Sequence, residues 1–108
     1  MMPQDSLSMS CLEVGCGRGS ISEKIVPRVA HLIVVDISAR LAQDVGTRLN
    51  VEWRKEDACN LTFQDESFDL VVSSECIEHT VDPRQALAEM ARVVKNNGTL
   101  IVSSPNKI

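Results

Sequence analysis

Residues 11–19 contain the group of side chains in this chain best suited to hold a ligand. They read Cys-Leu-Glu-Val-Gly-Cys-Gly-Arg-Gly, an apolar run that ends in Gly15, Gly17 and Gly19. Glycine turns the backbone at positive φ and has no side chain to keep a ligand away from it. The start of the helix expected next adds free N–H groups that point toward a bound group. A strand, a glycine turn and a helix in this order predict a site for an adenosine-type cofactor.

The spacing of these glycines argues against a dinucleotide site. Such sites follow the pattern G-x-G-x-x-G, whereas this chain reads G-x-G-x-G and has Ser20 where the third small residue would stand. Glu13 would also bring negative charge close to a pyrophosphate, and it suits a ligand whose reactive end is cationic. The chain has no Tyr that could donate a proton. A nicotinamide-dependent dehydrogenase is therefore the weaker alternative.

The elements that must position this stretch alternate between strand and helix. Apolar runs predict strands over residues 12–14, 31–36, 50–54, 68–74 and 99–103, and apolar spacing predicts helices over 18–29, 38–49 and 83–95. Pro27 should end or kink the first helix, Gly46 should interrupt the second, and residues 96–98 should form a turn after the third. This alternation predicts an α/β fold, a three-layer Rossmann-like parallel sheet in the order 3-2-1-4-5. The ligand would lie between the first and fourth strands.

Asp36 ends the second predicted strand about 20 residues after Gly15, which is the spacing at which an acidic residue reaches a ribose in such folds. A carboxylate can accept hydrogen bonds from two vicinal hydroxyls at once. The alternative is that Asp36 only caps the helix that follows.

Residues 11–19 resemble motif I of the class I, Rossmann-like S-adenosylmethionine-dependent methyltransferases. The resemblance implies S-adenosylmethionine as cofactor and S-adenosylhomocysteine as product, with Glu13 near the methionine amino end. It assigns cofactor binding to Glu13, Gly15, Cys16, Gly17 and Gly19.

Residues 55–58 resemble the motif with which this family reads adenine. The resemblance implies that Asp57 accepts a hydrogen bond from the exocyclic amine and that the backbone N–H of Ala58 donates to the ring. Ile37 would lie against the adenine. The alternative is a solvated charge cluster, and we expect Glu56 to be solvated in either case.

Residues 74–83, with 93–98 and 104–106, resemble the type 11 branch that contains the ubiquinone-pathway O-methyltransferases. The resemblance covers nearly the whole chain and places Glu75 at the cofactor. His79 is the candidate catalytic base, since its ordinary pKa suits proton removal near neutral pH, or it is structural. Glu75, Glu78 and His79 form E-x-x-E-H, a weak candidate for a divalent metal. We expect no metal, because many relatives carry this pattern without one.

Composition limits the remaining possibilities. The chain has 108 residues, which predicts one domain over 1–108, and its net charge of -4 argues against a nucleic-acid partner. No apolar run of about 18 residues and no leader are present, so we expect no membrane span and a cytoplasmic location. The four cysteines (Cys11, Cys16, Cys59 and Cys76) include no C-x-x-C pair and should be reduced thiols.

The chain stops before the C-terminal antiparallel hairpin that the family usually has. The fifth strand would then be an apolar edge, which natural proteins rarely leave uncovered. We therefore expect a truncated domain or a homodimer through that edge. Two functions stay open. One is methyl transfer in line to the oxygen or nitrogen of a small-molecule acceptor, and the other is a non-catalytic or fragmentary cofactor-binding or interaction module.

Overall fold

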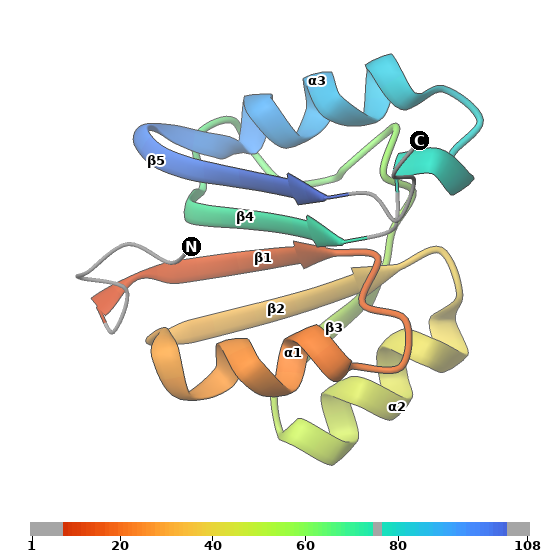
Figure 1. Cartoon of the computed structure of the whole chain (residues 1–108), viewed down its shortest axis with the longest axis vertical. Helices are drawn as coiled ribbons and strands as arrows, with labels where there is room; N and C mark the ends of the chain where they lie inside the picture. Colours follow the sequence, from red (N-terminus) through yellow and green to blue (C-terminus); the bar gives the residue numbers. More distant parts are fainter. Residues whose placement is uncertain (1–7, 75–76, 104–108) are drawn as a thin grey trace.

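The computed structural model describes residues 8–74 and 77–103, and of Glu78 it describes the backbone alone. The strands are β1 (Ser10–Val14), β2 (His31–Asp36), β3 (Glu52–Lys55), β4 (Phe68–Ser74) and β5 (Val94–Ser103). The helices are α1 (Ser20–Ile25), α2 (Ala39–Leu49) and α3 (Pro83–Val93), with short 3-10 turns η2 (Val26–Arg28) and η3 (Ile77–His79). Figure 1 shows the sheet with α1 and α2 at one side and α3 beside β5.

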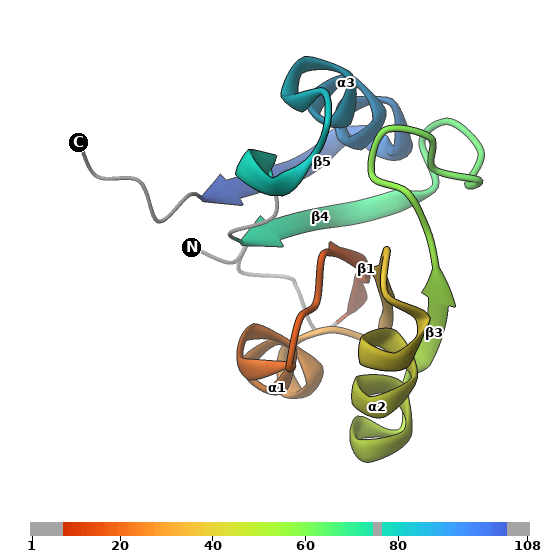
Figure 2. The ribbon, with the colours of Figure 1, turned by 90° about the vertical axis from the view of Figure 1, so that its right-hand side faces the viewer.

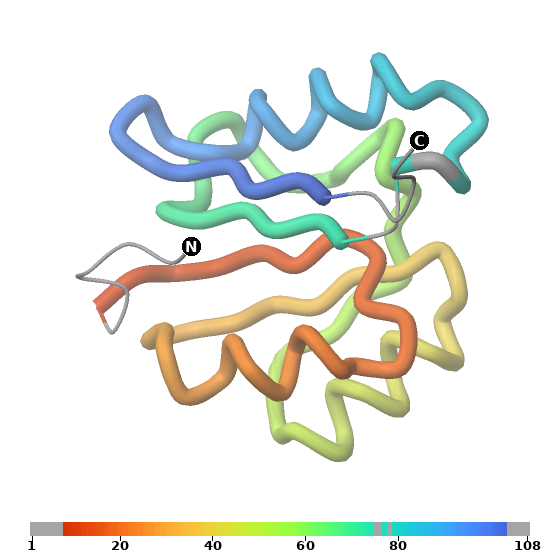
Figure 3. The backbone as a smooth tube through the Cα atoms, viewed as in Figure 1, coloured from red at the N-terminus to blue at the C-terminus, as the bar shows by residue number. Residues whose placement is uncertain are grey.

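The described strands form one parallel sheet in the order β3-β2-β1-β4-β5, as predicted. The chain enters at the centre with β1 and moves outward through β2 to β3. It then returns across the sheet to β4 and ends at the other edge with β5 (Figure 3). The direction of winding therefore reverses between β1 and β4, and a doubly wound sheet binds its ligand at such a point.

Apolar side chains fill both sides of the sheet, because successive strand residues point to opposite faces. One core cluster joins Cys11, Val34 and Leu70 of the strands to Ile25, Ala42 and Val45 of α1 and α2. The other joins Leu12, Val35 and Val71 to Ala86, Met90 and Val93 of α3. The helices therefore cover the sheet from both faces, α1 and α2 on one and α3 on the other (Figure 2).

Two helix boundaries follow directly from the sequence. Helix α1 ends at Ile25, and Pro27 lies in η2, which confirms the predicted break because proline has no backbone N–H to continue an α-helix. Helix α2 begins after Ser38, whose hydroxyl accepts from the backbone N–H of Leu41 at 3.2 Å.

The prediction that Gly46 interrupts α2 is wrong. The helix continues through Gly46 to Leu49, and Trp53 of β3 packs against the glycine. A Cβ at this position would lie 2.4 Å from Cδ1 of Trp53, so the glycine provides room for the indole ring. The turn comes at Asn50, which has a φ of 58°, and β3 starts at Glu52 instead of residue 50.

The boundary between α3 and β5 also differs from the prediction. Strand β5 already begins at Val94, which pairs with Phe68, and the next pairing is Leu70 with Thr99. Residues 95–98 therefore form an irregularity opposite Asp69 instead of a turn that precedes the strand. Because pairing with β4 decides where β5 starts, the helical pattern of residues 83–95 could not show it.

Strand β5 lies at one edge of the sheet, as predicted. Association of two chains through this edge stays a prediction. The described thiols of Cys11, Cys16 and Cys59 are free, while Cys76 lies outside the described residues. Among the helices of residues 8–74 and 77–103, none has the length and apolar character needed to cross a membrane.

Candidate functional site

A pocket of about 480 Å³ opens at the carboxyl ends of β1, β2 and β4. Its lining comes from residues 13–18 and 20–21, 35–37, 56, 58, 74, and 79–81. Four of these segments follow or end different strands, which brings residues far apart in the sequence to one edge of the sheet. The pocket lies where the winding of the sheet reverses, as the sequence predicts.

The glycine loop between β1 and α1 forms one wall of this pocket. Gly15, Gly17 and Gly19 all have positive φ, at 78°, 54° and 91°. Gly17 has no neighbouring atom within 4 Å of where a Cβ would be, so a ligand can approach its backbone directly. At Gly19 the φ of 91° would strain any other residue, and a Cβ would also lie 3.1 Å from a methyl group of Val45 on α2.

Asp36 holds the glycine loop against the end of β2. Its Oδ2 accepts from the backbone N–H of Gly17 at 3.0 Å, and its Oδ1 accepts from the backbone N–H of Ser38 at 2.9 Å. A carboxylate offers about four acceptor positions, so both oxygens can still accept from a ligand. Asp36 therefore orders the turn before α2 and also lines the pocket, while its contact with a ribose stays a prediction.

Glu13 places a carboxyl group at the base of the pocket. It is only 1% exposed, and its Oε1 accepts a hydrogen bond from the Ser22 hydroxyl of α1. Burial raises the pKa of Glu13 to about 7; the Ser22 hydrogen bond opposes this shift, and the charge of Asp36 adds to it. No residue described by the structure forms an ion pair with Glu13, so a cationic ligand group would supply the missing counter-charge.

Cys16 also lines the pocket, and it is buried. Burial, the charge of Asp36 and the charge of Glu13 together raise the pKa of its thiol to about 12. The thiol therefore stays protonated near neutral pH, so Cys16 contributes shape and not a nucleophile.

In the segment after β3, the acidic side chain that lines the pocket is not the one that the sequence predicts. Ala58 and Glu56 line the pocket, whereas Asp57 is exposed and its Oδ1 accepts from the backbone N–H of Cys59 at 2.9 Å. Glu56 is 7% exposed and accepts from the backbone N–H and hydroxyl of Thr62, at 2.9 and 2.5 Å. The expectation that Glu56 is solvated is therefore wrong. Asp57 begins a turn in which its carbonyl accepts from the backbone N–H of Asn60 at 2.8 Å.

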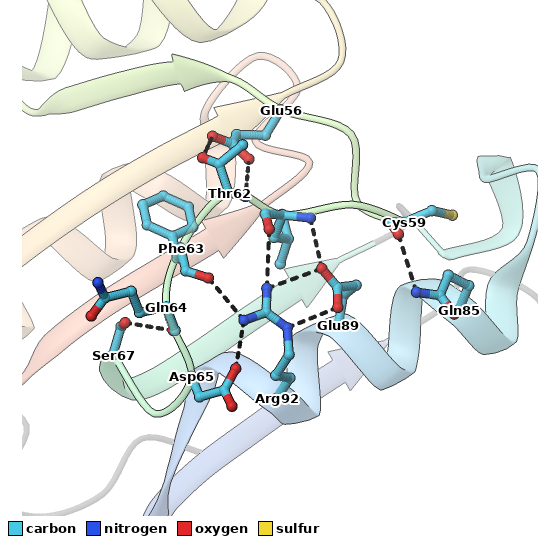
Figure 4. A network of polar contacts seen from close by, with 11 residues as sticks. Glu56, Cys59, Thr62, Phe63, Gln64, Asp65, Ser67, Gln85, Glu89 and Arg92 are labelled. Atoms are coloured by element: carbon cyan, nitrogen blue, oxygen red, sulfur yellow. Dashed lines mark hydrogen bonds and ion pairs between the residues drawn. The ribbon is translucent and has the colours of Figure 1, made fainter.

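A polar network on α3 fixes this segment in place, and sequence reasoning missed it (Figure 4). The Arg92 guanidinium donates to both oxygens of Glu89, to the carbonyls of Leu61 and Phe63, and to Asp65, at 2.8–3.0 Å. Glu89 in turn accepts from the backbone N–H of Leu61 at 2.8 Å, and these bonds hold its pKa below the usual value. The only signal in the sequence is the spacing of Glu89 and Arg92 by three residues on a predicted helix.

The η3 side of the pocket presents His79, Thr80 and Val81. His79 is exposed and Val81 is 95% exposed, so this side forms the open rim. The hydroxyl of Thr80 donates to the carbonyl of Ile77 at 2.9 Å, which fixes the Thr80 side chain against η3.

Part of the predicted site lies outside the described residues. This holds for Glu75, which was expected at the cofactor, and for the side chain of Glu78. Of the weak metal candidates Glu75, Glu78 and His79, only His79 has a described side chain. Across residues 8–74 and 77–103 no three His, Cys, Asp or Glu side chains are grouped as metal ligands.

The arrangement offers three kinds of contact along one pocket. Asp36 can accept from hydroxyl groups, Ile37 presents an apolar side chain that is 63% exposed, and Glu13 can pair with a cation. Together they suit an elongated ligand with a diol, a flat ring and a positively charged end.

Comparison with known proteins agrees with this geometry. A family model described as "Methyltransferase domain" matches residues 12–102. A probable S-adenosylmethionine-dependent methyltransferase of Mycobacterium tuberculosis is 36% identical over 98 residues, which covers 90% of this chain and 36% of that protein. A ubiquinone biosynthesis O-methyltransferase of Hahella chejuensis is 33% identical over 102 residues and covers 89% of this chain and 43% of that protein.

The fold has close counterparts among solved structures. The YcgJ protein from Bacillus subtilis superposes with a TM-score of 0.85 at 27% identity, over 92% of this chain and 45% of that chain. The chain therefore has a methyltransferase-type Rossmann-like fold, and it spans less than half the length of the relatives it matches.

Proposed function

This chain belongs to the family of methyltransferase domains, and we propose that it binds S-adenosylmethionine and supports transfer of the methyl group to a small-molecule acceptor. The observation that carries the proposal is the convergence of Glu13, Asp36 and the glycine loop on one pocket at the switch point of the sheet. Relatives named as S-adenosylmethionine-dependent methyltransferases support this choice of cofactor.

We assign the contacts to the cofactor from one end of the pocket to the other. Asp36 accepts from the two ribose hydroxyls, and Ile37 and the backbone of Ala58 contact the adenine. Gly17 allows the ligand to approach the loop backbone, and Glu13 pairs with the amino group of the methionine end. Asp57 would first have to release the backbone N–H of Cys59 before it could reach the adenine amine.

The cofactor supplies an electrophilic methyl group bound to a positively charged sulfur. The pocket residues would hold it so that an acceptor oxygen or nitrogen could bond to the methyl carbon as the carbon–sulfur bond breaks, with that bond's electron pair left on sulfur. S-adenosylhomocysteine is then the product. Because the methyl group is already activated, positioning is the main contribution of the protein.

We place the acceptor at the open rim formed by His79, Thr80 and Val81. The exposed Val81 side chain offers an apolar contact, and His79 can take the proton from an acceptor hydroxyl. The name of the ubiquinone biosynthesis O-methyltransferase supports an oxygen atom as the methyl acceptor.

Methyl transfer from labelled cofactor to a panel of phenols, catechols, sugars and amines tests this function. We expect transfer to at least one hydroxyl acceptor and a loss of about 10²-fold in His79→Ala. Arg84 is exposed in the first turn of α3 and does not line the pocket, so the control variant Arg84→Met should retain the wild-type rate. Cofactor binding without transfer to any acceptor would favour the alternative of a non-catalytic binding module.

A further inference from the structure

Ser22 is a fully buried serine whose hydroxyl forms a hydrogen bond with Glu13. It lies in α1, only two residues after the helix begins, and its side chain is 0% exposed. Its hydroxyl donates to Oε1 of Glu13, which is itself buried and lines the pocket. The other carboxylate oxygen, Oε2, receives no hydrogen bond from any described group. One oxygen of Glu13 is therefore fixed by the protein, and the other is left for a ligand.

We propose that Ser22 is a positioning residue, whose hydroxyl fixes one oxygen of the Glu13 carboxylate so that the other oxygen is available to the amino end of the cofactor. This inference rests on the proposed function. A carboxylate in an apolar setting gains from a charged hydrogen bond, and the same bond removes one rotational freedom of a flexible side chain. Loss of the hydroxyl would therefore weaken cofactor binding in a way that depends on pH.

The groups around Glu13 determine the direction of this dependence. Asp36 of β2 and Glu56 after β3 are acidic, Cys11 on β1 and Cys16 in the glycine loop are buried thiols, and Arg18 and His79 line the same pocket. Burial raises the pKa of Glu13 to about 7, and the Ser22 hydrogen bond lowers it from what burial alone would give. Binding of a cationic group should therefore be strong above this pKa and weaken as the pH falls through it.

The experiment is a calorimetric titration of the chain with S-adenosylhomocysteine between pH 5.5 and 8.5. Ser22→Ala should move the pH at which affinity declines upward by about one pH unit, which makes binding about fivefold weaker at pH 7 and about tenfold weaker near pH 6. Ser22→Thr keeps the hydroxyl and should restore the wild-type profile. Glu13→Gln should bind weakly with little dependence on pH, and adding Ser22→Ala to it should change little more.

Ser73 provides a matched control, because it is a serine that is 1% exposed and its buried hydroxyl has no hydrogen-bond partner among the described residues. It is not part of the pocket lining, so Ser73→Ala should retain the wild-type affinity and pH profile.

Two results would overturn the inference while leaving the proposed function intact. One is an unchanged pH profile in Ser22→Ala. The other is an equal loss of affinity from Ser22→Ala in the wild-type and Glu13→Gln backgrounds, which would mean that Ser22 acts only on the packing of α1. Failure of the folded wild-type chain to bind would instead refute the proposed function, and this inference with it.

Discussion

Replacing Arg92 by Met tests whether the network on α3 holds the segment that leads from β3 to β4. Arg92 donates five hydrogen bonds to Glu89, Asp65 and two backbone carbonyls (Figure 4). Methionine preserves much of the aliphatic stem and removes every donor. The variant therefore separates the hydrogen bonds from the packing of the side chain.

The expected magnitude follows from the surroundings of each bond. The pair with Asp65 is largely exposed and contributes less than about 1 kcal/mol. Glu89 has only 12% of its side chain exposed and would lose its charged partner, and the carbonyls of Leu61 and Phe63 would lose their donors. Hydrogen bonds to charged groups contribute about 1.5–3 kcal/mol each but do not add fully, and Arg92 is 30% exposed. We expect the free energy of unfolding to fall by about 2–3 kcal/mol.

Urea denaturation followed by circular dichroism measures this change, with Arg84→Met on the same helix as control. Arg84 is exposed, and its replacement should change the free energy of unfolding by less than about 0.5 kcal/mol. Because the anchored segment also carries Glu56 and Ala58, Arg92→Met should weaken cofactor binding as well. Equal stability of the two variants would refute the anchoring role of Arg92.

Two further predictions concern packing and charge elsewhere in the fold. Gly46→Ala should lower the free energy of unfolding by about 1–3 kcal/mol, because the new Cβ would meet Trp53. This loss should exceed the gain from the better helix propensity of alanine. A thermal melt that shows a more stable variant would contradict this packing. The backbone N–H of Ser10, with Lys95, lowers the pKa of Asp69, so its stabilising effect should be present above about pH 4 and be lost as the pH falls further. Asp69→Asn should therefore flatten the melting temperature between about pH 4 and 2, and an unchanged slope would exclude this contribution.

The sequence was sufficient to locate the sheet and most of the pocket. Strands 31–36 and 68–74 are continuous apolar runs with polar ends, and the structure has them at the predicted residues. Asp36 could be placed at the pocket because the end of a parallel strand fixes where the next side chains lie. These features depend on local pattern and on the general topology of alternating strands and helices.

The features that were missed depend on contacts between distant residues. Gly46 reads as a helix breaker until Trp53 is seen against it, and Glu56 reads as a surface charge until Thr62 is seen to bind it. Glu56 turns inward to accept from Thr62, and Asp57 turns outward to accept from Cys59, which no periodicity reveals. The role of Arg92 likewise requires a loop about 30 residues earlier in the chain to lie against α3.

The central claim is that the pocket binds this cofactor. Calorimetric titration with S-adenosylhomocysteine tests it most directly, with a separate titration with NAD as the control. The wild-type chain should bind S-adenosylhomocysteine one to one and should not bind NAD. Asp36→Asn should weaken binding by roughly 10- to 100-fold, since it loses charged hydrogen bonds to the ribose. The exposed Asp44 on α2 lies outside this pocket, and Asp44→Asn should bind like the wild type. A folded chain that binds neither ligand, or an Asp36→Asn variant with wild-type affinity, would contradict the account.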